Sequence, residues 1–147
     1  MSTCYLPDVN VWFALSRPEH QHHASAHEWL LSIDTPHSVA FTRTTQQGYL
    51  RLLTTAAIMR IYSSAPLTNS EAWRLWENWF KDERIHWTDE PSDVTPVWQR
   101  FGAIRTASSK RWMDSYLASL ALGSGYQLVT LDGAFLNFKG LDVRVIV

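Results

Sequence analysis

Short apolar runs alternate with helix-type patterns along this chain, and that alternation limits the folds open to it. Strand-like runs are expected at residues 4–6, 39–41, 85–87, 127–131 and 143–147. Strands that are joined by helices pair in parallel and are covered on both faces. We therefore expect an α/β fold, a three-layer α/β/α domain with a central, mostly parallel sheet. In such sheets ligands bind beyond the carboxyl ends of the strands.

Helical patterns fill the intervals between these runs. Helices are expected from about Val11, over 21–33, before Tyr49, and over 109–122. Three pairs of residues have the spacing of helix starts: Thr44 with Gln47, Thr68 with Glu71, and Thr95 with Pro96. Apolar residues at helical spacing are expected to share buried faces, namely Val97, Phe101 and Ile104 on one helix and Met113, Leu117 and Leu120 on another.

Length and composition favour one globular domain over residues 1–147. Hydrophobic residues make up 46% of the 147 residues and charged residues 18%, enough for a proper core. The formal net charge is −1, so the chain has no global basic field. A nucleic-acid partner must then be held by a local basic patch or by metal ions.

The single cysteine and the first apolar run indicate the cellular compartment of the protein. Cys4 stands alone, which excludes an internal disulfide, and its apolar surroundings predict a buried thiol. Asp8 and Asn10 interrupt the first apolar run, so neither a signal peptide nor a membrane span is expected. We expect a cytoplasmic protein that does not bind a membrane.

Three aspartates stand where a parallel sheet collects ligands. Asp8 and Asp132 each follow a predicted strand directly, and Asp114 falls in the early turns of a predicted helix. Converging carboxylates repel one another unless cations neutralise them, and oxygen-only ligands suit Mg²⁺ or Mn²⁺. Such an ion lowers the pKa of bound water. Each aspartate alone also fits a turn residue or helix cap, and periodicity does not show that the three meet.

Three segments resemble the aspartate motifs of PIN domains, most closely those of the VapC toxins of bacterial toxin–antitoxin pairs. They follow in order and register over nearly the whole chain: LPDVNV at 6–11, MDSYLA at 113–118, and LVTLD at 128–132. The resemblance implies a metal-dependent endoribonuclease that cleaves structured RNA, such as tRNA or rRNA. It also implies Mg²⁺ or Mn²⁺ as cofactor, a VapB-type antitoxin as partner, and a homodimer.

By that resemblance, Asp8, Asp114 and Asp132 are the catalytic, metal-binding acids. Asn10 and Thr130 fall where the family has polar residues that orient ligands or water. No GxGxxG or GxxxxGK[ST] stretch occurs, so no nucleotide cofactor is expected.

One stretch departs from the usual PIN pattern, which carries a glutamate in the helix after the second strand. Here residues 44–51 read TTQQGYLR and contain no acid. This resembles a mycobacterial-type VapC subgroup with a T-Q-x-G-x-x-R pattern. The missing anionic ligand predicts weaker metal binding, or a second metal that arrives only with RNA. An alternative is a catalytically weakened PIN fold that serves as an RNA-binding or assembly module.

Residues 99–113 form an acid-free basic stretch that leads into Asp114. It carries four positive charges, on Arg100, Arg105, Lys110 and Arg111. Because the rest of the chain is net negative, we expect RNA phosphates to be held here by Arg105, Lys110 and Arg111. The alternative is an ordinary solvated helix face.

Two further clusters need an interpretation. His23 and His27 are four residues apart and could chelate zinc, but without a third ligand in view they are expected to face solvent. The expected helix with Trp73, Trp76, Trp79 and Phe80 has wide aromatic coverage, which core packing explains in part. Rings that the core does not absorb would face a partner groove for an antitoxin helix or a second protomer.

Overall fold

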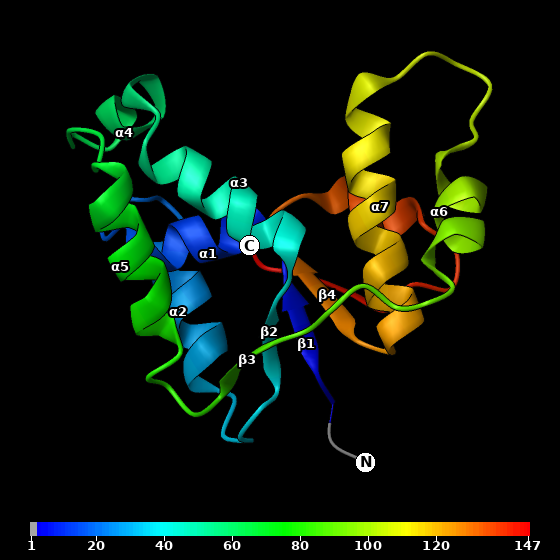
Figure 1. Cartoon of the computed structure of the whole chain (residues 1–147), viewed down its shortest axis with the longest axis horizontal. Helices are drawn as coiled ribbons and strands as arrows, with labels where there is room; N and C mark the ends of the chain where they lie inside the picture. The colour runs from blue at the N-terminus through cyan, green and yellow to red at the C-terminus, as the bar shows by residue number, and fades with distance from the viewer. Residues whose placement is uncertain (1–2) are drawn as a thin grey trace.

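A parallel sheet organises residues 3–147, the part of the chain that this computed structural model describes (Figure 1). Its five strands lie in the order β3-β2-β1-β4-β5, and every neighbouring pair is parallel. The strands are β1 (Tyr5–Pro7), β2 (Val39–Phe41), β3 (Ile85–Trp87), β4 (Gln127–Thr130) and β5 (Val143–Val145). All five expected strands are therefore present, with small differences at their ends.

Helices cover both faces of the sheet, as the alternating pattern predicts. One face carries α1 (Val9–Ser16), α2 (His23–Leu31), α3 (Arg43–Leu53), α4 (Ala56–Ile61) and α5 (Asn69–Trp79). The other carries α6 (Val94–Gly102), α7 (Ser109–Ser124) and the short 3₁₀ helix η1 (Gly133–Asn137). The three-layer α/β/α architecture is thus confirmed. Within residues 3–147, no helix combines the length and apolar character that crossing a membrane would require.

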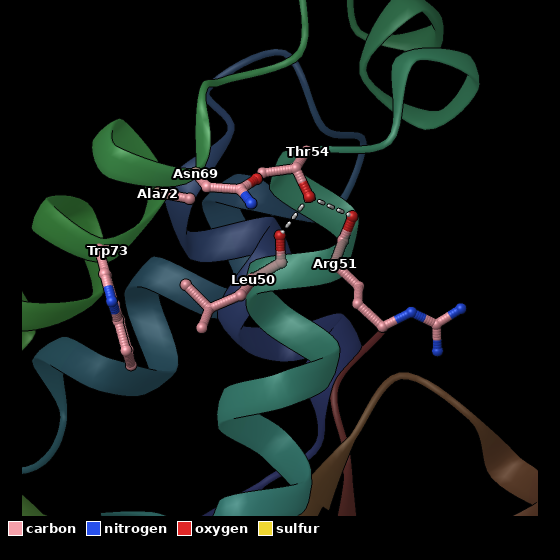
Figure 2. A pocket seen from close by; sticks show the side chains of 6 residues that line it. All are labelled: Leu50, Arg51, Thr54, Asn69, Ala72 and Trp73. Atoms are coloured by element: carbon pink, nitrogen blue, oxygen red, sulfur yellow. Dashed lines mark hydrogen bonds between the residues drawn. The ribbon is translucent and has the colours of Figure 1, made fainter.

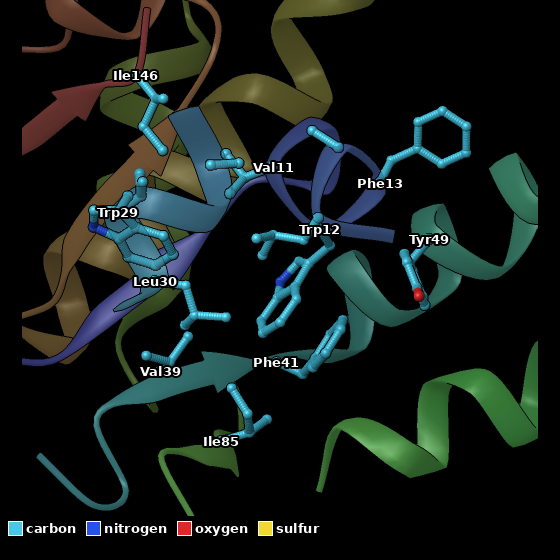
Figure 3. Close-up of a cluster of buried hydrophobic side chains, with 14 of the residues drawn as sticks. Val11, Trp12, Phe13, Trp29, Leu30, Val39, Phe41, Tyr49, Ile85 and Ile146 are labelled. Carbon is cyan, nitrogen blue, oxygen red and sulfur yellow. The ribbon is translucent and has the colours of Figure 1, made fainter. Parts of the chain in front are cut away.

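Two hydrophobic cores, one on each face, hold the layers together. Successive side chains of a strand point to opposite faces, so Val39 and Phe41 enter one core while Ala40 enters the other. In the first core the Trp12 ring stacks on Phe41 with centroids 3.8 Å apart, and Tyr49 packs nearby (Figure 3). This core fixes α1 and α3 against the sheet.

Two of the predicted helix starts are wrong and one is confirmed. The capping box of α3 is formed by Thr42 and Thr45, because the extended backbone of β2 continues to Thr42 and leaves it as the N-cap. Asp93 is the N-cap of α6, so Thr95 already lies inside the helix. Thr68 and Glu71 make the predicted capping box of α5.

Three expectations about burial are also wrong. Ile104 lies beyond the end of α6 and is 41% exposed. Met113 is 59% exposed, because the first turns of α7 extend past the carboxyl end of β4 (Figure 1). Leu117, further along α7, is buried as predicted. Cys4 precedes β1 and is only half-buried.

Candidate active site

The carboxyl ends of β1 and β4 meet at one edge of the sheet, where the strand order reverses. The two strands pair with Pro7 opposite Val129, and the Asp8 N–H donates to the Val129 carbonyl at 2.8 Å. Asp132 follows β4 after one intervening residue. Such a switch point is where open parallel sheets bind ligands, so the topology places both aspartates at the expected edge.

A lysine on α7 links two of the three aspartates. The Lys110 ammonium lies 2.8 Å from an Asp132 carboxylate oxygen and 3.4 Å from an Asp114 oxygen. The carboxylates of Asp114 and Asp132 also raise the pKa of Asp8. The structure therefore brings Asp8, Asp114 and Asp132 into one neighbourhood.

Asp8 is the most enclosed of these acids. One of its carboxylate oxygens accepts the Val9 N–H at 2.7 Å, which caps α1, and the other accepts the Thr130 hydroxyl at 2.9 Å. Burial raises the pKa of Asp8, the charges of Asp114 and Asp132 raise it further, and these two hydrogen bonds oppose the rise. Burial is the largest of these effects, so the folded chain disfavours the ionised form of Asp8 unless a cation lies close to it.

Asp132 divides its two oxygens in a similar way. One accepts the Ala134 N–H at 2.9 Å and so caps η1, while the other accepts from Lys110. The lysine and the N–H group lower the pKa of Asp132. The helix-cap interpretation of Asp8 and Asp132 is thus correct in local terms, and in each residue the second oxygen accepts from another side chain, Thr130 or Lys110.

A cleft of about 500 Å³ opens beside Asp8 and Asp114. Its walls come from α3 and α7, which Figure 1 shows on either side of the carboxyl ends of β1 and β4. Gly48 lets the α3 wall approach, because a Cβ there would lie 2.6 Å from a methyl group of Val9. Besides Asp8 and Asp114, the cleft is lined by Val9, Thr44, Gln47, Gly48, Leu50, Arg51, Met113 and Leu117.

The polar residues on the α3 wall were not among the predicted site residues. Thr44, Gln47 and Arg51 reach the cleft from one face of the helix, three and four residues apart. This wall presents the Arg51 guanidinium to the cleft and no carboxylate. The signal was present in the helical spacing of these polar residues opposite buried Tyr49.

The two predicted supporting residues both contact the loop between β4 and η1. The Thr130 hydroxyl donates to Asp8 and accepts the Asp132 N–H at 3.0 Å, so it joins two of the acids. The Asn10 side-chain oxygen accepts the Leu131 N–H at 3.3 Å and ties α1 to that loop. Both residues hold the backbone and carboxylates in place.

The three predicted RNA-binding residues lie in different surroundings. Arg105 is exposed, before α7. Lys110 faces the acids. Arg111 turns inward, because its guanidinium donates to the Phe101 carbonyl at 2.9 Å and lies 4.4 Å from the centre of the Phe138 ring. Contact of these residues with RNA stays a prediction.

The donor set fits Mg²⁺ or Mn²⁺ in kind, since it consists of carboxylate oxygens around a buried, under-neutralised acid. Nevertheless, over residues 3–147 no three His, Cys, Asp or Glu side chains are arranged to hold one metal ion.

The histidine cluster lies away from this site. One ring nitrogen of His23 bonds to the Ala14 carbonyl at 2.7 Å, and the His23 ring stacks on the exposed His27 ring. Among residues 3–147 no third ligand is placed to complete a zinc site with His23 and His27.

Similar proteins share both the sequence and the fold. No family model matches the chain. Ribonuclease VapC41 of Mycobacterium tuberculosis is 40% identical over 142 residues, which cover 96% of this chain and 97% of that protein.

Two solved structures share the fold at low sequence identity. VapBC-1 from nontypeable Haemophilus influenzae is 13% identical and superposes with a TM-score of 0.66 over 97% of this chain and 98% of that one. VapC20 of M. tuberculosis, described as a sarcin-ricin loop cleaving toxin, is 17% identical with a TM-score of 0.63 over 95% and 98%. These likenesses confirm the resemblance that the three motifs predicted.

Replacing Thr130 with valine removes the hydroxyl between Asp8 and Asp132 at nearly constant volume. We expect the pKa of Asp8 to rise further and the free energy of unfolding to fall by about 1–3 kcal/mol at neutral pH. An acid whose pKa is raised by folding costs stability once it ionises. The penalty should therefore be present at neutral pH and shrink as the pH falls below the folded-state pKa of Asp8.

NMR titration of the Asp8 carboxyl carbon and denaturant unfolding at two pH values measure both effects. Thr130→Ser keeps the hydroxyl and should behave as the parent protein. An Asp8 pKa that is the same in the valine variant and the parent would show that Thr130 does not support this carboxylate.

Proposed function

This chain belongs to the VapC ribonuclease family, and on that premise we propose that it is a metal-dependent endoribonuclease acting as the toxin of a toxin–antitoxin pair. One domain, spanning residues 1–147, carries the activity. The observation that supports this most is the gathering of Asp8, Asp114 and Asp132 around the end of β1 and β4, with Asp8 and Asp114 in a shared cleft.

The cluster of Asp8, Asp114 and Asp132 would bind Mg²⁺ or Mn²⁺, with Asp8 and Asp114 facing the cleft and Asp132 beside them. The ion supplies a water of lowered pKa and positive charge for the phosphodiester. Thr130 and the Val9 N–H orient the Asp8 carboxylate from behind, and Asn10 holds the loop that carries Asp132. These residues are supporting groups, and hydrolysis takes place on the open side of the acids.

The surroundings of the cleft suit a structured RNA. Arg51 lines the cleft on the α3 side, and Arg105 is exposed before α7, so phosphates on both sides of the scissile bond would meet positive charge. VapC20 is described as cleaving the sarcin-ricin loop. We place the substrate of this chain in the same class, tRNA or rRNA, and its action in the cytoplasm.

A groove between α3 and α5 offers a surface for a VapB-type antitoxin. It has a volume of about 270 Å³ and is lined by Leu50, Arg51, Thr54, Asn69, Ala72 and Trp73. Figure 2 shows Trp73 facing Leu50 across the groove, while Arg51 points away from Trp73. Trp73 is 47% exposed, and an amphipathic antitoxin helix would cover it. The toxin itself is expected to be a homodimer.

Asp8→Asn should remove nuclease activity and relieve growth arrest while leaving the fold intact. Mutation of residues that merely support a metal ligand costs about 10–100-fold, so loss of a ligand should cost at least about 100-fold. Cleavage of total RNA with Mn²⁺ and growth after induction without antitoxin measure this. Asp34→Asn, an exposed aspartate before β2, is the matched control.

Full activity of the folded Asp8→Asn protein would contradict the metal mechanism. RNA binding without cleavage by the parent protein would instead favour the alternative, a PIN fold that serves as an RNA-binding or assembly module.

Arg105→Ala should weaken RNA binding and lower its salt dependence by up to about one counterion equivalent. Its side chain is exposed on the segment before α7, whereas Arg111 is held by Phe101 and Phe138. RNA affinity measured over a range of salt concentrations, with the Asp8→Asn protein as background, tests this. Arg74→Ala, on exposed α5, is the control, and an equal effect of both changes would place the RNA elsewhere.

Trp73→Ser should weaken antitoxin binding by about 2 kcal/mol, roughly 30-fold, because a large ring at the centre of a groove carries much of the binding energy. Calorimetry with a VapB-type protein that binds the parent chain measures the loss. Trp112→Ser is the control, since Trp112 is 59% exposed but lies on α7. If Trp112 mattered and Trp73 did not, the antitoxin would bind the α7 side.

A further inference from the structure

Lys110 holds an unusual position among the acids of the site. It is spaced as an ordinary helix pair with Asp114, four residues along α7, but its shorter contact is with Asp132, which follows another element. The ammonium therefore bridges two carboxylates that come from separate parts of the chain. Its side chain is 68% exposed, so the two carboxylates, and not burial, hold it there.

The acids of the site offer two separate positions at which a cation can lie. Asp8 and Asp114 both line the cleft, and Asp132 does not. Lys110 already lies between Asp114 and Asp132. Among residues 3–147 no three His, Cys, Asp or Glu side chains are already arranged around one point, which agrees with two separate positions. The position between Asp8 and Asp114 is the one left for a divalent cation.

One divalent ion brings the net charge of the site to zero. Three ionised carboxylates carry three negative charges, Lys110 neutralises one, and one divalent cation neutralises the other two. A second divalent cation would leave the site with a net positive charge next to Arg51. The α3 wall supplies no further carboxylate to balance it, since it presents Thr44, Gln47 and Arg51.

We propose that Lys110 acts as a built-in second cation, so that this site binds a single divalent ion between Asp8 and Asp114. The inference rests on the proposed metal-dependent nuclease and specifies its metal content. Lys110 takes the place that a second metal has in nucleases with two ions about 3.5–4 Å apart. Its two contacts bring Asp114 and Asp132 together in this structure.

Counting bound Mn²⁺ tests this without reference to activity. Calorimetric titration, with free Mn²⁺ followed by electron paramagnetic resonance, should give about one ion per chain for the full-length parent protein. Lys110→Met removes the charge, keeps the side-chain length and adds no good ligand for a hard cation. This variant should bind about two ions, the second between Asp114 and Asp132.

Two controls accompany the count. Lys110→Arg keeps the charge and should retain about one ion, while Lys139→Met removes the same charge from an exposed position and should also retain about one. A parent protein that binds two ions would overturn the inference, as would a Lys110→Met variant that still binds one. Binding by neither protein would instead overturn the metal-dependent function itself.

Discussion

β1 and β4 run side by side in parallel, and their pairing in register decides where the acids lie. With Pro7 opposite Val129, the Asp8 N–H reaches the Val129 carbonyl and the Thr130 hydroxyl reaches the Asp8 carboxylate. A shift of the register by one residue would turn Thr130 to the other face of the sheet. The site therefore depends on this strand pair, which the two cores clamp from both sides.

Bringing like charges to one edge has an energetic cost that the surrounding residues offset. Burial and the neighbouring carboxylates raise the pKa of Asp8, so the folded chain favours a cation there. The N–H groups at the starts of α1 and η1 partly stabilise Asp8 and Asp132, and Lys110 adds a full positive charge. Asp8 and Asp132 are thus helix caps and site acids at once.

The α3 helix connects the cleft with the groove beside Trp73. Leu50 and Arg51 line both hollows, one on each side of the helix end. A partner seated against Trp73 would therefore contact residues that also face the cleft. This shared wall accounts for how a small partner bound beside the acids could restrict access of RNA to them without touching Asp8 itself.

The sequence by itself determined the order of strands and helices and the placing of Asp8 and Asp132 after strands, because apolar periodicity and capping act over a few residues. The three aspartate motifs, in their order and spacing, also indicated the family to which the chain belongs. Only the tertiary structure decided that Lys110 bridges two acids, that Arg111 turns inward and that Met113 is exposed. Those outcomes depend on contacts between segments that are far apart in the chain, and no local pattern records which segments will meet.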